Sequence, residues 1–370
     1  MQRFNTRDGN YQIEVYDGSD VLWITFDHAG LPGKPIDKRN GWGAAPLLKL
    51  GVSVLCIKAR HRCWYTRSDM VDFFQGHWFQ AQCKGKKRII LYGLSMGGFA
   101  ALIYSSLIPG SVVLALSPRT SLHLSFGNRP HKILSDDWTV PYSDFNDVID
   151  NYKQAYIIYS RGNVKDKKQV ELIANHHSIT TIEVTGSSHN QIGPLIEVCI
   201  MSKVLQAISE ARFSKNYFDS LAPLLEKSPT EHLYRAEDSP NRGFRDVSFT
   251  RARELSAPKS WTKLDQKIIQ RRFQWTIKED DVHTFIGLVK HICTNKALHS
   301  SAGLVMFAIR KSLLLKQTNL AQTALDTLLS SPNLNTKMRG KIDDLLDNNS
   351  HLYDNSISQH QSLVTKTSNI

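Results

Sequence analysis

The sequence predicts an α/β fold in which a doubly wound, mainly parallel sheet precedes a smaller all-helical C-terminal domain. Short apolar segments of strand length alternate with helical segments over residues 11–210, which is the order of a doubly wound sheet. Within this alternation, residues 88–101 form a glycine-rich strand-to-helix turn with a serine at its centre. Beyond about residue 213 the strand signals end, and apolar residues recur at helical spacing.

The first strands precede the serine turn. Residues 11–16 and 21–26 are predicted strands joined by a polar turn, and 21–26 is nearly all apolar, as a strand buried on both faces should be. The next predicted elements are a short helix at 44–50, an interior strand at 52–58 and a helix at 70–82.

The serine turn reads Gly93-Leu94-Ser95-Met96-Gly97, between a buried strand at 89–92 and a helix at 99–107. A sharp strand-to-helix turn strains the backbone of its central residue, and neighbouring glycines avoid the resulting clashes. Such a turn exposes the Ser95 hydroxyl and aims the Met96 N–H where an oxyanion would form. The alternative is a glycine-rich turn of a nucleotide-binding fold, but neither of its phosphate-binding patterns is present.

The remaining strands of this domain are predicted at 112–116, 155–159 and 180–185, with helices at 169–176 and 193–210. Residues 119–150 form an irregular insert that is rich in Trp, His, Phe and Pro.

A serine hydroxyl needs a neighbouring base to become nucleophilic, and that base needs a group that orients it. His189 is the best candidate base, because it follows the last predicted strand in a Gly-Ser-Ser-His turn. Other histidines are less well placed, since they end a helix or lie in the irregular insert; they are His123, His131, His176 and His177.

The orienting acid is expected between the serine and the histidine in sequence, after the preceding strand. Asp166 has this position, and its carboxylate would hold the imidazole in one tautomer. Asp166 alternatively balances the neighbouring lysines in solvent, and three other carboxylates could replace it: Asp144, Asp147 and Asp150.

Together, these residues give the first domain a resemblance to the α/β-hydrolase fold superfamily, over residues 11–210 and in the order serine, acid, histidine. The resemblance implies a second oxyanion donor just after the strand ending at Phe26, so Asp27 or His28 would supply it. Here the chain has Phe-Asp-His-Ala-Gly instead of the family's common His-Gly patterns. The family's cap corresponds to the insert at 119–150, which makes three side chains candidate substrate contacts: Arg119, Arg129 and Trp138.

The domain boundaries follow the change of pattern: 1–212 for the hydrolase-like domain, 213–260 for a linker or arm, 261–347 for helices and 348–370 for a disordered tail. The helices are expected at 263–275, 281–294, 302–316, 319–329 and 336–347. The pair at 302–332 is faintly similar to a tetratricopeptide hairpin, and the alternative is a small helical bundle.

Composition limits the classes of function. The chain has 370 residues, which suits two domains, with 41% hydrophobic and 22% charged residues, as in soluble globular proteins. The first residues are polar and no apolar run has the length of a membrane span, so we expect neither a signal peptide nor a transmembrane segment. Five scattered cysteines predict reduced thiols in a cytoplasmic protein, with no metal site and no cofactor.

The net charge of +12 permits an anionic partner, but basic and acidic residues are interleaved along both halves of the chain. The densest basic runs, at 84–88 and 165–168, lie beside predicted strands in solvated connections. No recognised nucleic-acid module accompanies them, so nucleic-acid binding is not expected.

Two hypotheses follow. The first is a serine hydrolase or acyltransferase that acts on an ester, thioester or amide, with a polar substrate linked to a saccharide or a peptide. The second is a catalytically inactive hydrolase-fold scaffold that binds a protein partner through its C-terminal helices. All three residue types of a catalytic triad are present at suitable positions, which favours the enzyme.

Overall fold

The computed structural model describes residues 1–30, 35–122, 145, 151–176, 178–185, 189–190, 192–239, 241–256, 261–278, 281–294, 302–314, 318–329, 340, 342 and 344. Most of the insert at 119–150 lies outside these ranges, including Arg129, Trp138 and the three alternative carboxylates. The chain divides into two compact units, Met1–Ala252 and Arg253–Ile370.

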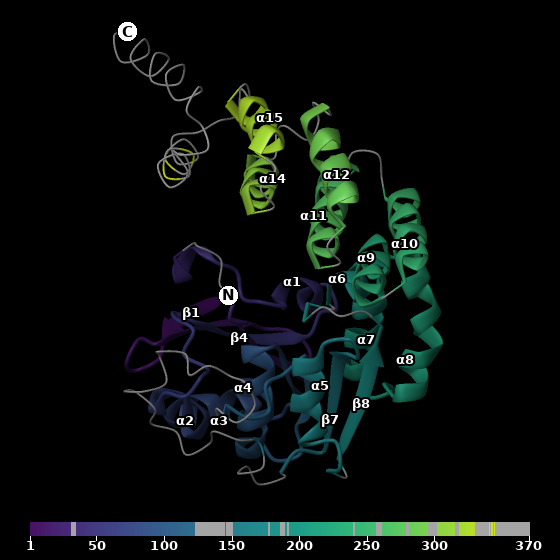
Figure 1. The fold of residues 1–370 in the computed structure, drawn as a ribbon. Coiled ribbons are helices and arrows are strands. Elements are labelled where there is room, and N and C mark those ends of the chain that lie inside the picture. Colours follow the sequence, from purple (N-terminus) through teal and green to yellow (C-terminus); the bar gives the residue numbers. More distant parts are fainter. Residues whose placement is uncertain are drawn as a thin grey trace, which may run out of the picture. The chain divides into compact units, whose positions relative to one another are not determined.

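The first unit is built on a central, mainly parallel sheet (Figure 1). Its eight strands have the order β1-β2-β4-β3-β5-β6-β7-β8. The pairs β1–β2 and β2–β4 are antiparallel, and the other pairs are parallel. The predicted fold class is confirmed. The strand bounds are Gln2–Asn5, Tyr11–Tyr16, Val21–Phe26, Ser53–Ala59, Arg88–Leu94, Val112–Leu116, Gln154–Ser160 and Ile179–Val184, from β1 to β8.

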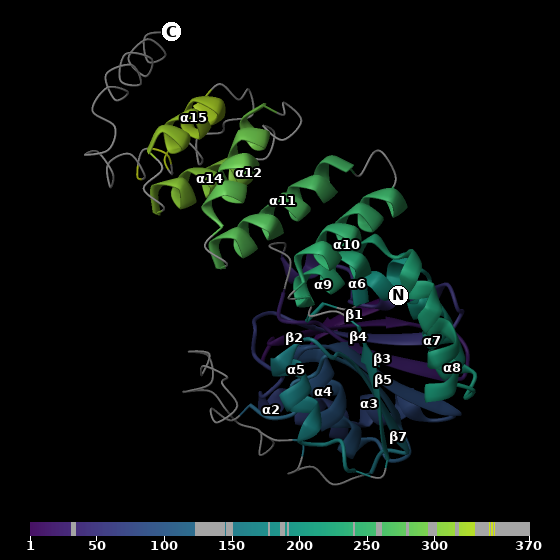
Figure 2. The same cartoon turned by 45° about the vertical axis from the view of Figure 1, so that its right-hand side comes forward.

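Helices cover both faces of this sheet (Figures 1 and 2). One face packs against α2 (Ser68–Gln75), α3 (His77–Cys83), α4 (Met96–Tyr104) and α5 (Val164–Glu171). The other packs against α1 (Ala44–Leu48), α6 (Ile192–Glu197), α7 (Ile200–Ser209) and α8 (Lys215–Leu221). The sheet is therefore buried on both sides, which explains its nearly continuous apolar strands.

Two predicted helices are each divided in the structure. The segment at 70–82 breaks at Gly76, whose φ of −70° and ψ of 146° are those of extended backbone, so α2 and α3 are separate. The segment at 193–210 breaks at Cys199, which has a left-handed φ of 58°. Apolar spacing continues across both breaks, and it could not reveal them.

The predicted linker at 213–260 is largely helical. It contains α8, the 3₁₀ helix η6 (Ala222–Lys227), α9 (Pro229–Asp238) and α10 (Arg242–Leu255). Phe218, Leu221 and Leu225 pack into the core beneath α7, so most of this segment belongs to the first unit. Pro229 occupies the first turn of α9, where proline is compatible with a helix.

The second unit contains α11 (Trp261–Lys278), α12 (Val282–Thr294), α14 (Ala302–Leu314) and α15 (Thr318–Leu329). Phe285, Val289, Ile309 and Leu325 lie in its own apolar core. The predicted helix at 336–347 and the tail at 348–370 lie almost entirely outside the described residues, and the tetratricopeptide similarity remains a prediction. None of the helices that the structure describes is both long and apolar enough to cross a bilayer.

Stability of the first unit depends on an aromatic cluster beneath β3. The Phe74 ring lies 4.8 Å from the ring centroids of both Phe79 and Tyr104 and 6.3 Å from that of Phe26. We expect Phe74→Ala to lower the free energy of unfolding by about 3–5 kcal/mol, because it leaves a cavity in this cluster. Urea denaturation measures the loss. The control is Val164→Ala, whose side chain is exposed, and an equal loss in both variants would contradict the packing described here.

Candidate active site

Ser95 occupies a strained turn between β5 and α4. Its φ of 57° and ψ of −110° lie outside the usual regions for a residue with a side chain, and its N–H donates to the Leu116 carbonyl at 2.9 Å. A Cβ at Gly93 would lie 2.1 Å from the Gly97 carbonyl carbon, so only glycine fits there. Unlike the buried residues around it, Ser95 is partly exposed. The turn therefore places a partly exposed Ser95 directly after the carboxyl end of β5.

The first turn of α4 packs directly on the end of β3. A Cβ at Gly97 would lie 2.5 Å from the Phe26 carbonyl oxygen and 3.0 Å from that of Asp27. The amides of this first turn, including that of Met96, have no partner within the helix and mark its positive end. The end of β3 thus lies against the first turn of α4, which directly follows Ser95.

The two proposed donors after β3 differ in the structure. The Asp27 N–H donates to the Ile57 carbonyl at 3.3 Å and continues the ladder between β3 and β4. In the part of the chain that the structure describes, the His28 N–H has no such acceptor. This difference favours His28 over Asp27 as a donor to an oxyanion.

Asp166 and His189 form a hydrogen-bonded pair. The His189 Nδ1 atom lies 2.8 Å from Asp166 Oδ1 and 2.9 Å from Oδ2. The Asp166 side chain is 1% exposed and that of His189 is 38% exposed. With Nδ1 directed at the carboxylate, Nε2 is the ring nitrogen left for proton transfer.

Asp166 lies in the first turn of α5, whereas the sequence placed it in a loop before a helix at 169–176. The Asn163 side chain caps this helix by accepting hydrogen bonds from the amides of Lys165 and Asp166, both at 3.1 Å. The cap fixes the first turn of α5, and with it the carboxylate that faces His189.

Topology brings these residues to one edge of the sheet. Ser95, Asp166 and His189 follow the carboxyl ends of β5, β7 and β8, which are parallel, and His28 follows β3 in the same direction. Burial lowers the pKa of His28, and the charges of Arg39 and His189 lower it further. The lowered pKa favours the neutral form of the His28 imidazole.

Helix α9 contacts residues that precede and follow His189 in the sequence. The hydroxyl of Thr185, where β8 ends, donates to the buried Glu231 carboxylate, and the Tyr234 hydroxyl donates to the Asn190 carbonyl at 3.4 Å. Sequence reasoning missed both α9 residues because it assigned them to a linker. The capping pattern Ser228-x-x-Glu231 was the available signal, and the Ser228 hydroxyl does accept from the Glu231 N–H at 3.0 Å.

The described start of the insert is anchored to α5. The Gln169 side-chain oxygen accepts from the amides of Thr120 and Ser121 at 2.6 and 2.9 Å. Arg119, a predicted substrate contact, directly precedes them and is partly exposed. The described residues contain no group of three or more His, Cys, Asp or Glu side chains arranged as a metal site.

No protein-family model matches the chain, and a search of curated proteins gives no significant match. Among solved structures, the chain is similar to the capsule O-acetyltransferase of Neisseria meningitidis serogroup A, with 16% identity over 56% of this chain and 94% of that one, and a TM-score of 0.43. It is also similar to Est1E from Butyrivibrio proteoclasticus, with 16% identity over 57% of this chain and 98% of that one, and a TM-score of 0.39.

A third similar structure is an α/β serine hydrolase without lid from Xanthomonas campestris, with 16% identity over 55% of this chain and 90% of that one, and a TM-score of 0.37. All three scores are below 0.5, so the chemistry of this chain has to be inferred from its own residues.

We expect Gly97→Ala to destabilise the first unit by about 1–3 kcal/mol, because the new methyl group would press on the Phe26 carbonyl. Gly193→Ala in α6 is the control, since a Cβ there meets its nearest neighbour, a Thr230 methyl carbon, at an ordinary 4.0 Å. Denaturant unfolding compares the two variants. Equal stability of both would contradict the close approach of α4 to β3.

We expect Glu231→Ala to loosen the His189 turn, because Thr185 and Arg235 both lose their bond to this carboxylate. Hydrogen–deuterium exchange should become faster in peptides covering residues 179–190. Exposed Lys227 provides the control, and Lys227→Ala should leave exchange unchanged. Unaltered exchange in Glu231→Ala would show that α9 does not support this turn.

Proposed function

We propose that the first unit is a serine hydrolase or acyltransferase that acts through an acyl-serine intermediate on a carboxylic ester, thioester or amide. The observation that carries the proposal is the Asp166–His189 pair, because it lies at the same sheet edge as the strained Ser95 turn. A buried carboxylate directed at one ring nitrogen is what a general-base histidine requires.

In the proposed reaction, Ser95 Oγ attacks the substrate carbonyl carbon while His189 Nε2 accepts the hydroxyl proton. Asp166 holds the Nδ1–H tautomer and stabilises the imidazolium that forms. The Met96 and His28 amides donate to the oxyanion of the tetrahedral intermediate. When this intermediate collapses, the carbonyl re-forms, His189 protonates the leaving group, and the acyl group remains on Ser95.

The second half of the reaction releases the acyl group. Water or an acceptor hydroxyl gives its proton to His189 and attacks the acyl carbon, and Ser95 leaves with the proton from the imidazolium. Water would make the protein a hydrolase, and an acceptor hydroxyl would make it an acyltransferase. We propose a polar substrate such as a saccharide or peptide ester, with Arg119 as a contact and with Arg129 and Trp138 as further candidates from the insert.

The scaffold hypothesis rests on the second unit, whose helices have a core of their own and supply none of the proposed catalytic residues. These helices are the candidate site for a protein partner. Partner binding and catalysis are compatible, because the two roles use different parts of the chain.

We expect a fluorophosphonate probe to add one phosphonyl group to the wild-type protein, and peptide mass spectrometry to place it on Ser95. Ser95→Ala should abolish this labelling, since the nucleophile is lost. Asp166→Asn should slow it by up to about 10⁴-fold, because the amide no longer supports the productive tautomer of His189.

Circular dichroism and urea denaturation control for folding in both variants. The enzyme hypothesis fails if folded wild-type protein is not labelled at Ser95. Capture of a protein partner that requires residues 261–329 and persists in Ser95→Ala would then support the scaffold hypothesis.

A further inference from the structure

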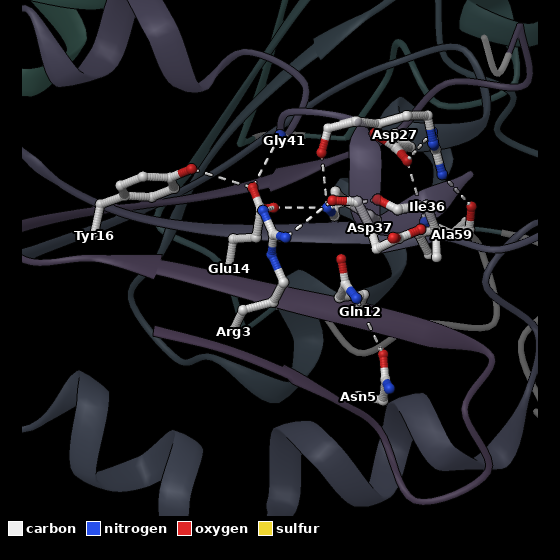
Figure 3. Close-up of polar contacts among 12 residues, drawn as sticks. Arg3, Asn5, Gln12, Glu14, Tyr16, Asp27, Ile36, Asp37, Gly41 and Ala59 are labelled. Carbon is white, nitrogen blue, oxygen red and sulfur yellow. Dashed lines mark hydrogen bonds and ion pairs between the residues drawn. The ribbon is translucent and has the colours of Figure 1, made fainter. Parts of the chain in front are cut away.

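A buried cluster of charged side chains lies beneath the segment that follows β3 (Figure 3). It joins Glu14 of β2, Lys58 of β4, Arg39 and Asp27, with Arg3 of β1 at its margin. The proposed chemistry uses none of these side chains directly. Their arrangement nevertheless converges on the backbone that precedes the His28 amide.

Lys58 is the centre of the cluster and is completely buried. Its ammonium group donates to Glu14 Oε1 at 2.6 Å, to the Ile36 carbonyl at 2.8 Å and to the Arg39 carbonyl at 2.8 Å. All three of its donor positions are thus used, and two of them hold the backbone of the segment at 36–39.

Glu14 anchors the same segment from β2. Its Oε2 atom accepts from the Gly41 amide at 3.1 Å and the Tyr16 hydroxyl at 3.2 Å, and Arg3 lies 2.6 Å from Oε1 (Figure 3). Burial opposes ionisation, but Lys58, the Gly41 amide and Arg3 outweigh it and hold the pKa of Glu14 below its usual value. Glu14 is therefore a carboxylate at neutral pH, and it balances the charge of Lys58.

Arg39 extends the cluster to the end of β3. Its guanidinium donates to Asp27 Oδ2 at 2.8 Å and to the Ala59 carbonyl at 2.8 Å, while the Ala59 N–H donates to the same Asp27 oxygen at 3.2 Å. Burial raises the pKa of Asp27, and Arg39 limits that rise. The result is a closed ring of contacts that ties the ends of β3 and β4 together.

The Asp27 backbone is held as firmly as its side chain. Its N–H donates to the Ile57 carbonyl, and the Tyr65 hydroxyl lies 3.3 Å from its carbonyl oxygen. Helix α4 lies close to the same carbonyl, since a Cβ added at Gly97 would lie 3.0 Å from its oxygen. Among the described residues, the following amide, that of His28, donates to none of the acceptors in this set of bonds.

Burying charges is a costly way to stabilise a fold. Each ion taken out of water costs several kcal/mol, and apolar residues of similar size often give equal or greater stability. Directional hydrogen bonds to backbone carbonyls also fix the position of the backbone. An oxyanion site needs its donors to be placed to within about 0.5 Å.

We propose that Arg39 and Lys58 are positioning residues that fix the His28 amide as the second oxyanion donor. This inference rests on the proposed function. Arg39 acts through Asp27, the residue directly before the donor, and Lys58 acts by holding the Arg39 backbone. Loss of one oxyanion donor costs about 10²–10³-fold in rate, so disruption of either residue should have an effect of up to that size.

The test compares rates of fluorophosphonate labelling at Ser95 over a range of probe concentrations. Arg39→Met alone would leave the buried Asp27 carboxylate without its ion pair, which would destabilise the fold strongly. Asp27→Asn combined with Arg39→Met removes both charges, and Glu14→Gln combined with Lys58→Met does the same for the second pair. Each neutral pair leaves no unpaired charge of the original ion pair buried, and it removes the directional bonds.

We expect each neutral pair to lower the maximal labelling rate by about 10–10³-fold, with little change in the half-saturating probe concentration. Arg39→Lys keeps the charge but loses the fork that reaches both Asp27 and Ala59, so its rate should be intermediate. Lys87→Met is the matched control, because it removes an exposed ion pair with Asp20 and should label at the wild-type rate.

The outcomes separate the two proposals. Failure of the wild-type protein to label at Ser95 overturns the proposed function, and this inference with it. Normal labelling of both the wild type and the folded neutral pairs overturns the inference alone. If the neutral pairs do not fold, Arg39→Lys decides, and a wild-type maximal rate in that variant also overturns the inference.

Discussion

The close approach of α4 to the end of β3 is the constraint on which the site depends. Gly93 and Gly97 leave no room for a side chain, and this lets the chain turn from β5 into α4 within one strained residue, Ser95. The strained conformation of Ser95 is maintained because the neighbouring strands are buried and the Ser95 N–H donates to the Leu116 carbonyl. Packing consequently holds Ser95 and the first turn of α4 against the end of β3.

Parallel strands supply the rest of the site. Because β3, β5, β7 and β8 all end at the same edge, residues that are far apart in the sequence lie at that edge. The Asp166–His189 pair fixes a ring tautomer, and α9 supports the turn on which His189 lies. The charged cluster of Glu14, Lys58, Arg39 and Asp27 joins β2 and β4 to the backbone that directly precedes His28. Each proposed catalytic residue is therefore held in place by neighbouring residues that have no direct part in the proposed reaction.

Most of the sheet could be predicted from the sequence, because strands buried on both faces leave continuous apolar runs such as 21–26 and 112–116. The serine turn could be predicted because the glycines that it requires lie next to Ser95 in the sequence. Contacts between distant residues were not visible: Lys58 ends an apolar strand, and its partner Glu14 lies 44 positions away. Helix α9 was hidden by its proline and charges, since its packing against the His189 turn has no local signal other than a capping pattern.

A crystal structure of the fluorophosphonate-treated protein would test the central claim most directly. We expect the phosphonyl group on Ser95 Oγ, with one oxygen about 2.7–3.1 Å from the amide nitrogens of both Met96 and His28. His189 Nε2 should lie within hydrogen-bond distance of Ser95 Oγ or of the bound group, with Nδ1 still bonded to Asp166. A phosphonyl group on another residue, or one whose oxygen faces neither amide, would contradict the account.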